Sequence, residues 1–194
     1  MRGVDPRCRE EPCWTEIKRG ARIMDDAPQV PGVQTAKRVD KLVSGRPTLR
    51  FAVGNFDMWA DVQATVSDLT VGGMAENSFN CLGLHRVLAP LAARPDNRMS
   101  LRDLPFSRNV ELTSVTDGPL AACLAERLKM GAETLTAALG HWLIPRHAAQ
   151  LQDAVSAGKI VLWAQLFDND DERLAYRSRL LRSSNSVGVH DIVG

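Results

Sequence analysis

The stretch 159–192 constrains the fold more than any other part of the chain. Residues 160–167 are apolar at nearly every position, which predicts a strand that is covered on both faces. Asp168 is a good helix N-cap, and acidic residues follow it in the first turn, where the helix dipole favours them. Arginines gather toward the end of this helix, and residues 187–192 predict a last short strand. The stretch therefore predicts one strand–helix–strand unit.

The N-terminal half contains a second unit of the same kind. Residues 49–56 alternate between apolar and other side chains, as a strand does. Apolar residues then recur at three- and four-residue spacing over 58–70, which predicts an amphipathic helix. Asp57 can cap the start of this helix, and the Gly72–Gly73 pair ends it. A second strand is expected at 78–86, so the two halves of the chain share one pattern.

The segment between the two units is expected to be mainly loop and helix. Residues 89–109 contain three prolines and predict a long loop, followed by a short strand at 110–115. Leucines step at helical spacing over 119–139, which predicts an amphipathic helix. Gly131 inside it marks either a close approach or a break into two short helices. A further helix is expected at 146–157.

Residues 1–48 differ from the rest of the chain. They are polar, contain proline and glycine, and show no sustained period, so we expect a disordered N-terminal extension or linker. Met24 is a candidate true initiator. Cys8 and Cys13 would form half of a metal site only with two further ligands, which the surrounding sequence does not supply.

Composition excludes several classes of protein. The net charge is +1 with 24% charged residues, so no nucleic-acid partner is expected. No stretch has the roughly 18 consecutive apolar residues that a membrane span requires. The N-terminus lacks a secretory signal, and the four cysteines are scattered, which favours a reduced, cytoplasmic protein.

The four histidines are the candidate polar groups of a ligand groove: His85, His141, His147 and His190. Adjacent residues of a strand point to opposite faces, so His190 and Asp191 are not expected to form a dyad. His141 and His147 flank a proline turn at a spacing with no recognised metal geometry. Capping and surface roles are therefore the simpler interpretation, and no cofactor or metal is expected.

Other candidate sites also have a structural explanation. Cys81 and Cys123 are interpreted as small buried residues, because no neighbouring base or positive charge would activate either thiol. The acidic run at 168–172 lacks the central glycine of a calcium loop, so helix capping explains it. Gly118 precedes a helix and is weakly permissive for an anion, although Pro119 removes one donor.

Large apolar anchors are rare, since aromatic residues make up only 5% of the chain. Trp59, Trp142 and Trp163 are therefore interpreted first as core residues. The alternative for Trp142 is an interface: with Leu143 and Ile144 it stands at a helical turn and could anchor a dimer or a partner protein.

Several segments resemble the bacterial general stress (heat-induced stress) protein family. The run LIPRHAAQLQDAVSAGKIVL at 143–162, the acid-capped helix after it and the closing GVHDI at 188–192 carry the likeness. The first strand with its Phe56–Asp57 pair and the GPLAA start at Gly118 also fit it. The likeness covers about residues 49–192, and its motifs are turns, caps and strand patterns.

The resemblance implies an α+β, ferredoxin-like split βαβ sandwich over residues 49–192, and the residue patterns give the same arrangement, with a helical insertion at about 90–157. One face of such a sheet is usually open, so the insertion or a second subunit must cover the apolar strand at 160–167. The insertion of the family is often very rich in Gly and Ala. Residues 118–142 here are charged and amphipathic, which argues against a membrane role.

The family offers no catalytic residues to carry over. We therefore expect a non-enzymatic bacterial protein that acts in stress or regulation by self-association, as a homo-oligomer, or by binding a protein partner. The alternative is a small-ligand-binding protein or an enzyme, with the four histidines in a groove between the sheet and the insertion.

Overall fold

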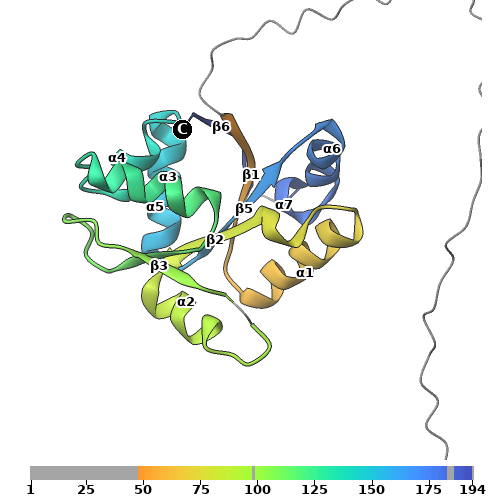
Figure 1. Ribbon diagram of the computed structural model, residues 1–194, viewed down its shortest axis with the longest axis horizontal. Helices are drawn as coiled ribbons and strands as arrows, with labels where there is room; N and C mark the ends of the chain where they lie inside the picture. The colour runs from red at the N-terminus through yellow and green to blue at the C-terminus, as the bar shows by residue number, and fades with distance from the viewer. Residues whose placement is uncertain (1–47, 98, 183–185, 194) are drawn as a thin grey trace, which may run out of the picture. The chain divides into compact units, whose positions relative to one another are not determined.

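A six-stranded antiparallel sheet forms the centre of the part of the chain that the structure describes (Figure 1). The computed structural model describes residues 48–97, 99–182 and 186–193. The strands are β1 (Thr48–Phe56), β2 (Phe79–Leu84), β3 (Leu101–Leu104), β4 (Thr113–Thr116), β5 (Ile160–Leu166) and β6 (Ser186–Val193). They follow the order β3-β4-β2-β5-β1-β6 along the sheet, and all neighbouring pairs are antiparallel.

Seven α-helices and one 3₁₀ helix connect the described strands. They are α1 (Trp59–Val71), η1 (Glu76–Ser78), α2 (His85–Ala92), α3 (Pro119–Lys129), α4 (Leu135–Leu139), α5 (Pro145–Ser156), α6 (Asn169–Arg177) and α7 (Arg179–Arg182). Both expected strand–helix–strand units are present, as β1-α1-β2 and β5-α6-β6 with the short helix α7 added. In the sheet, β5 lies between β1 and β2, and β1 lies between β5 and β6. The two units therefore alternate within one sheet.

The helix after β1 begins without the cap that the sequence predicted. Met58 is the N-cap residue of α1, and no side chain accepts a hydrogen bond from the first backbone N–H groups of the helix. The carboxylate of Asp57 instead lies 3.0 Å from the ammonium group of Lys159, at the start of β5. The expected cap at Asp57 was therefore wrong, because a long-range ion pair takes its side chain. The end of the helix matches the prediction, since Gly73 adopts a φ of 113° just beyond α1.

The expected loop at 89–109 was also wrong. His85 does not end β2 but begins α2, and β3 follows within the same segment. Pro90 lies inside α2, where it has no N–H to donate to the carbonyl of Arg86. Leu88 and Leu91 are buried under the sheet, and their burial offsets the lost hydrogen bond.

The segment 119–139 forms two helices, the second of the two alternatives that the sequence left open. Gly131 has a φ of 89° between α3 and α4 and ends the first of them. Thr134 then caps α4, because its hydroxyl oxygen accepts a hydrogen bond from the backbone N–H of Ala137 at 3.0 Å. The helix expected at 146–157 is α5, which buries the same residues that its pattern predicted: Ala148, Leu151, Ala154 and Val155.

The cap at the start of α6 is confirmed. Asp168 Oδ1 accepts hydrogen bonds from the backbone N–H groups of Asp170 and Asp171, at 2.8 and 2.9 Å. The helix is shorter than expected, since Ser178 interrupts it before α7. The Ser178 hydroxyl donates to the carbonyl of Ala175 at 2.8 Å and accepts from the N–H of Leu180 at 3.2 Å, which stabilises this break.

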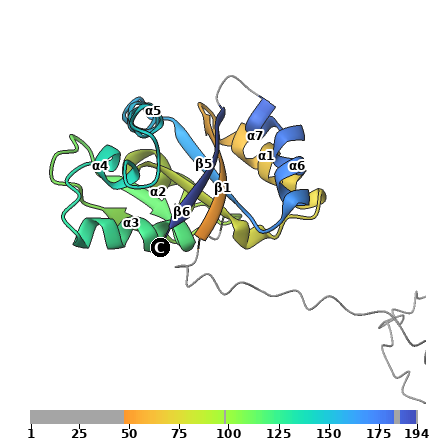
Figure 2. The same ribbon diagram turned by 90° about the horizontal axis from the view of Figure 1, so that it is seen from above.

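Helices cover both faces of the sheet. Figure 2 shows α3, α4 and α5 on one side and α1, α6 and α7 on the other. Each face has its own core, with Trp163 in the first and Leu162 in the second. Every residue of β5 is buried, as its apolar run predicted. The helices α3, α4 and α5, which lie between β2 and β5 in the chain, cover the face that contains Trp163.

The described residues all belong to one compact unit of the chain. The expectations for residues 1–47, namely disorder, a start at Met24 and no role for Cys8 or Cys13, lie outside the described residues. Among the described helices, none combines the length and the apolar character that crossing a membrane requires.

Candidate ligand-binding groove

A groove opens where β4 separates from β2. The two strands pair regularly from Leu84–Thr113 to Leu82–Val115, and the regular pairing ends there. Side chains replace the missing rungs of the ladder. Thr116 Oγ1 accepts a hydrogen bond from the backbone N–H of Cys81 at 2.9 Å. Asn80 Nδ2 donates to the carbonyls of Thr116 and Asp117, at 3.2 and 3.1 Å. These contacts fix the point of separation, which we call the strand fork.

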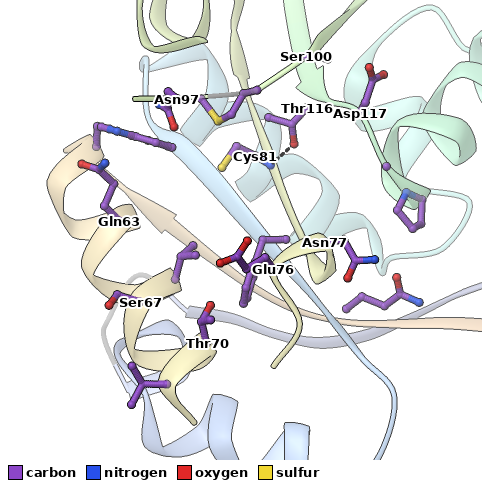
Figure 3. Close-up of a pocket in the computed structure, with 18 of the residues that line it drawn as sticks. Gln63, Ser67, Thr70, Glu76, Asn77, Cys81, Asn97, Ser100, Thr116 and Asp117 are labelled. Atoms are coloured by element: carbon purple, nitrogen blue, oxygen red, sulfur yellow. Dashed lines mark hydrogen bonds between the residues drawn. The ribbon is translucent and has the colours of Figure 1, made fainter. Parts of the chain in front are cut away.

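The fork, the helix α1 and the loop before β3 enclose a volume of about 950 Å³ (Figure 3). A volume of this size suits a small organic ligand. We call it the α1 groove. Gln63, Ser67 and Thr70 line it from α1, and Figure 3 shows Asn97 and Thr116 on the opposite wall. Apolar side chains complete the lining: Trp59, Val66, Val71, Phe79, Met99, Pro119 and Phe167.

Two polar atoms in the lining are buried without a hydrogen-bond partner among the described residues. They are the indole Nε1 of Trp59 and the hydroxyl oxygen of Thr70. Buried polar atoms in native proteins are nearly always hydrogen-bonded, so each of these two sites has unused capacity. A ligand with polar groups in the groove could satisfy both atoms.

Cys81 lines the groove but is a poor nucleophile. The residue is buried, and loss of solvation raises the pKa of its thiol to about 12. The thiolate, which is the reactive form, is therefore scarce at neutral pH. Burial also raises the pKa of the half-buried thiol of Cys123 on α3. The interpretation of both cysteines as small apolar residues agrees with these surroundings.

No histidine lines the α1 groove. His85 lies at the start of α2, where its Nδ1 is 2.8 Å from Asp103 Oδ1 and 3.0 Å from Ser114 Oγ. The Ser114 hydroxyl donates to the same Asp103 oxygen at 2.6 Å. In a hydrolytic triad the serine and the aspartate contact different nitrogens of the imidazole ring, whereas here both contact Nδ1. The geometry therefore indicates a hydrogen-bonded cluster that links α2 to the strands β3 and β4.

This hydrogen-bonded cluster stabilises the charged form of the Asp103 carboxyl group. The hydrogen bond from Ser114 lowers the pKa of the Asp103 carboxyl, and the hydrogen bond and charge of His85 lower it further. Loss of solvation opposes both effects. About half of the Asp103 side chain is exposed, so we assign the cluster a local structural role only.

The structure pairs histidines that the sequence analysis did not pair. The rings of His147 on α5 and His190 on β6 are 5.1 Å apart between centroids, in an edge-to-face arrangement. His190 Nε2 lies 3.1 Å from the carbonyl oxygen of Val187. His141 packs its ring against Trp142 instead of approaching His147. Asp191 forms an ion pair with Arg50 at 3.5 Å.

The paired histidines predict a loss of stability in weak acid. Loss of solvation lowers the pKa of His190 below its ordinary value of 6.5, and the charge of His147 adds to this. The unfolded chain therefore binds a proton more readily, so the free energy of unfolding should decrease as the pH falls below 6.5 toward the lowered pKa. We expect His190→Gln to reduce this decrease, measured by urea unfolding at about pH 7.5 and about pH 5.5. An unchanged pH dependence in the variant would show that His190 does not contribute.

The candidate interface residues have different environments. Leu143 is 3% exposed and belongs to the core under α3–α5, whereas Ile144 is 58% exposed. Trp142 is partly buried and packs against the same core. Of the three, Ile144 alone therefore offers a large apolar surface to a partner. Among the described residues, no group of three or more His, Cys, Asp or Glu side chains could hold a metal ion.

The α1 groove was not predicted from the sequence. Trp59 and Val66 were assigned to the core stripe of their helix, and both do pack against the core around Leu162. They are only partly buried, however, and they also line the groove, whereas Val62, Thr65 and Leu69 form the buried face of α1. The available signal was the mixed polar and apolar stripe at three- and four-residue spacing on α1: Trp59, Gln63, Val66, Ser67 and Thr70. That stripe indicates a half-covered helix face, but the opposite wall comes from segments far away in sequence.

Comparison with known proteins identifies no relative. No family model matches the chain, and no curated protein or solved structure matches it significantly. The resemblance to the general stress proteins therefore stays a prediction.

Proposed function

We propose that this protein is a non-enzymatic binding protein that takes a small organic ligand in the α1 groove. The observation that carries the proposal is the pair of unpartnered polar atoms, on Trp59 and Thr70, in a groove of about 950 Å³. A role without catalysis is supported by the protonated thiol of Cys81 in this groove and by the histidines, which lie elsewhere. The stress or regulatory role that the resemblance implies, in the bacterial cytoplasm, would follow from ligand occupancy.

We also propose that the fold belongs to the ferredoxin-like class, as a single domain over residues 49–192. Four strands in the order β2-β5-β1-β6, with β1 antiparallel to β5, support this proposal. So do α1 and α6, which join the strands of each half and contribute to the same core. In this description, β3, β4 and α2 to α5 form the insertion.

The binding proposal predicts that filling the groove abolishes ligand binding. Ser67 is exposed on α1 and lines the groove, whereas its neighbour Asp68 is exposed and does not. We expect Ser67→Trp to weaken the binding of groove ligands by more than about tenfold and Asp68→Trp to leave it unchanged. The measurement is a fragment screen by amide chemical-shift changes in the ¹⁵N-labelled full chain, followed by titration of the hits.

The outcome of this screen decides the proposal. Shift changes that cluster on Trp59, Thr70 and the strand fork, and that disappear in Ser67→Trp alone, support it. Hits that map to another surface, equal effects of the two tryptophan variants, or no hits at all would contradict it. Both variants add the same side chain to the same helix, so a general loss of folding would affect them alike.

A second candidate function is self-association, which the sequence favoured. The supporting observation is the position of β6 at an edge of the sheet, where no other described strand pairs with its outer side. Pairing of β6 with a second copy would join two sheets. Native mass spectrometry of the full chain distinguishes the candidates, because a dimer without added mass favours self-association and a monomer with a bound small molecule favours the groove.

A further inference from the structure

A second pocket lies where α4 and α5 meet the loop that joins β3 to β4. It has a volume of about 620 Å³, which lies within the range of sites for small molecules. The sheet contributes the buried residues Leu84 and Thr113, and the loop contributes residues 108–111. The remaining described lining residues belong to α4, its cap and α5: Thr134, Thr136, Gln152 and Ser156. We call this site the α4–α5 pocket.

The loop wall of the α4–α5 pocket is fixed at both ends. At one end the backbone N–H of Arg108 donates to the carbonyl of Glu133 at 3.0 Å, and the Arg108 guanidinium lies 2.6 Å from the Glu133 carboxylate. At the other end the carbonyl of Leu112 accepts a hydrogen bond from the N–H of His85 at 2.8 Å. Residues 109–111 between these anchors are therefore held in place before a ligand arrives, which lowers the ordering cost of binding.

Two amide side chains line the pocket, and each donates a hydrogen bond to a hydroxyl group. Asn109 Nδ2 donates to Oγ1 of the buried Thr113 at 3.1 Å. Gln152 Nε2 donates to Ser156 Oγ at 3.0 Å, and Gln152 Oε1 accepts from the backbone N–H of Thr136 at 3.3 Å. The first bond leaves the Asn109 amide its carbonyl oxygen and one N–H hydrogen. The second leaves the Ser156 hydroxyl its own hydrogen and one lone pair.

This arrangement offers both a donor and an acceptor on the loop wall and on the helical wall. A hydroxyl group of a sugar or cyclic polyol also donates and accepts, so two neighbouring hydroxyls match both functions of an amide. A carboxylate only accepts and an ammonium group only donates, so each would leave half of these groups unused. Val110 lines the pocket with an exposed side chain, which can cover the C–H face of a sugar ring and remove apolar surface from water.

We propose that the α4–α5 pocket is a second binding site, which takes a monosaccharide or a cyclic polyol through the amide of Asn109 and the hydroxyl of Ser156, with Gln152 positioning that hydroxyl. The observation that carries the proposal is the pair of oriented amides, one on a fixed loop and one on α5. The site is independent of the α1 groove, because the two share no described lining residue.

The test titrates a small panel into the ¹⁵N-labelled full chain: glucose, galactose, mannose and myo-inositol. We expect at least one of them to give saturable amide shifts at Asn109, Val110 and Gln152, with a dissociation constant of about 1 mM or lower. Cyclohexanol is the matched probe for myo-inositol, since it has the same carbon ring and a single hydroxyl group. It should bind at least about tenfold more weakly.

Two variants on α5 assign the binding to the pocket. Gln152→Ala removes the amide that positions Ser156, and Ser156→Ala removes the hydroxyl group itself. Each should weaken the binding of the best probe by about fivefold or more. Gln150→Ala is the control, because Gln150 is exposed on the same helix outside the pocket, and it should leave the affinity unchanged. Alanine is favourable in a helix, and Ser156 is the last residue of α5, so Ser156→Ala tests the site even if Gln152→Ala affects folding.

Each result decides the proposal. Saturable shifts in the pocket that weaken in Gln152→Ala and Ser156→Ala, but not in Gln150→Ala, support it. The absence of saturable shifts at about 10 mM of every probe, equal binding of cyclohexanol, or equal effects of the Gln150 and Gln152 variants would overturn it. Shifts confined to the α1 groove would also overturn it. Ser67→Trp should leave sugar binding unchanged, so the result is separate from that of the groove.

Discussion

Trp163→Ala is expected to lower the free energy of unfolding by about 3 to 5 kcal/mol, which is a large part of the stability of a typical domain. Trp163 lies in the middle of β5 and is fully buried. Its ring meets Phe51 of β1 edge-to-face, with 5.8 Å between centroids. The side chain belongs to the core between the sheet and α3–α5, so its removal leaves a cavity where the insertion packs on the sheet.

The matched control is Trp163→Phe. The indole Nε1 of Trp163 is buried without a partner among the described residues, so phenylalanine removes an unsatisfied donor and keeps a ring against Phe51. We expect this variant to cost less than about 1.5 kcal/mol. Both values come from guanidinium unfolding followed by circular dichroism. A loss below about 1 kcal/mol in Trp163→Ala would contradict the central role of this residue in the core.

The strands and helices of the two strand–helix–strand units could be predicted from the sequence because the patterns that specify them lie within short segments. Residues 160–166 are apolar almost throughout since β5 is covered on both faces, and Asp168 caps the next helix through N–H groups two and three residues away. The prediction failed at residues 85–104 because the local sequence pattern there differs from what the tertiary structure imposes. Pro90 is a local sign of a loop, but the burial of Leu88 and Leu91, which is a tertiary effect, outweighs it.

The α1 groove could not be read in the same way because no single segment contains it. Its walls come from α1, from η1 and the start of β2, and from the fork at Thr116–Asp117. The fork depends on contacts between residues about 35 positions apart, such as the hydrogen bond from the N–H of Cys81 to Thr116. The pairing of His147 with His190 is likewise a contact between α5 and β6. Periodicity predicts which residues are buried, but not which distant side chains meet.

Gly118→Ala is expected to lower the free energy of unfolding by about 3 kcal/mol, through two separate costs. Gly118 has a φ of 149°, which side chains other than that of glycine rarely allow. A Cβ atom at this position would also clash with Asn80 Nδ2. The amide of Asn80 would have to move, and the strand fork would lose the hydrogen bonds to the carbonyls of Thr116 and Asp117.

Gly131→Ala isolates the first of these costs. Gly131 has a φ of 89°, but no atom lies within 4 Å of the position that its Cβ would take, so this variant has backbone strain without a clash. We expect it to cost about 1 kcal/mol. If the two glycine variants lose equal stability in thermal or denaturant unfolding, the contact with Asn80 contributes nothing.

A double-mutant cycle isolates the second cost. Asn80→Ala removes the amide that a Cβ at Gly118 would strike, and it leaves the carbonyls of the fork unpaired in either background. Gly118→Ala should therefore cost about 1 kcal/mol in the Asn80→Ala background, against about 3 kcal/mol in the natural chain. The difference of about 2 kcal/mol is the coupling between the two positions, and additive losses would contradict it. Because the same fork forms one wall of the α1 groove, Gly118→Ala should also shift the amide signals of Thr116 and Asp117, whereas Gly131→Ala should not.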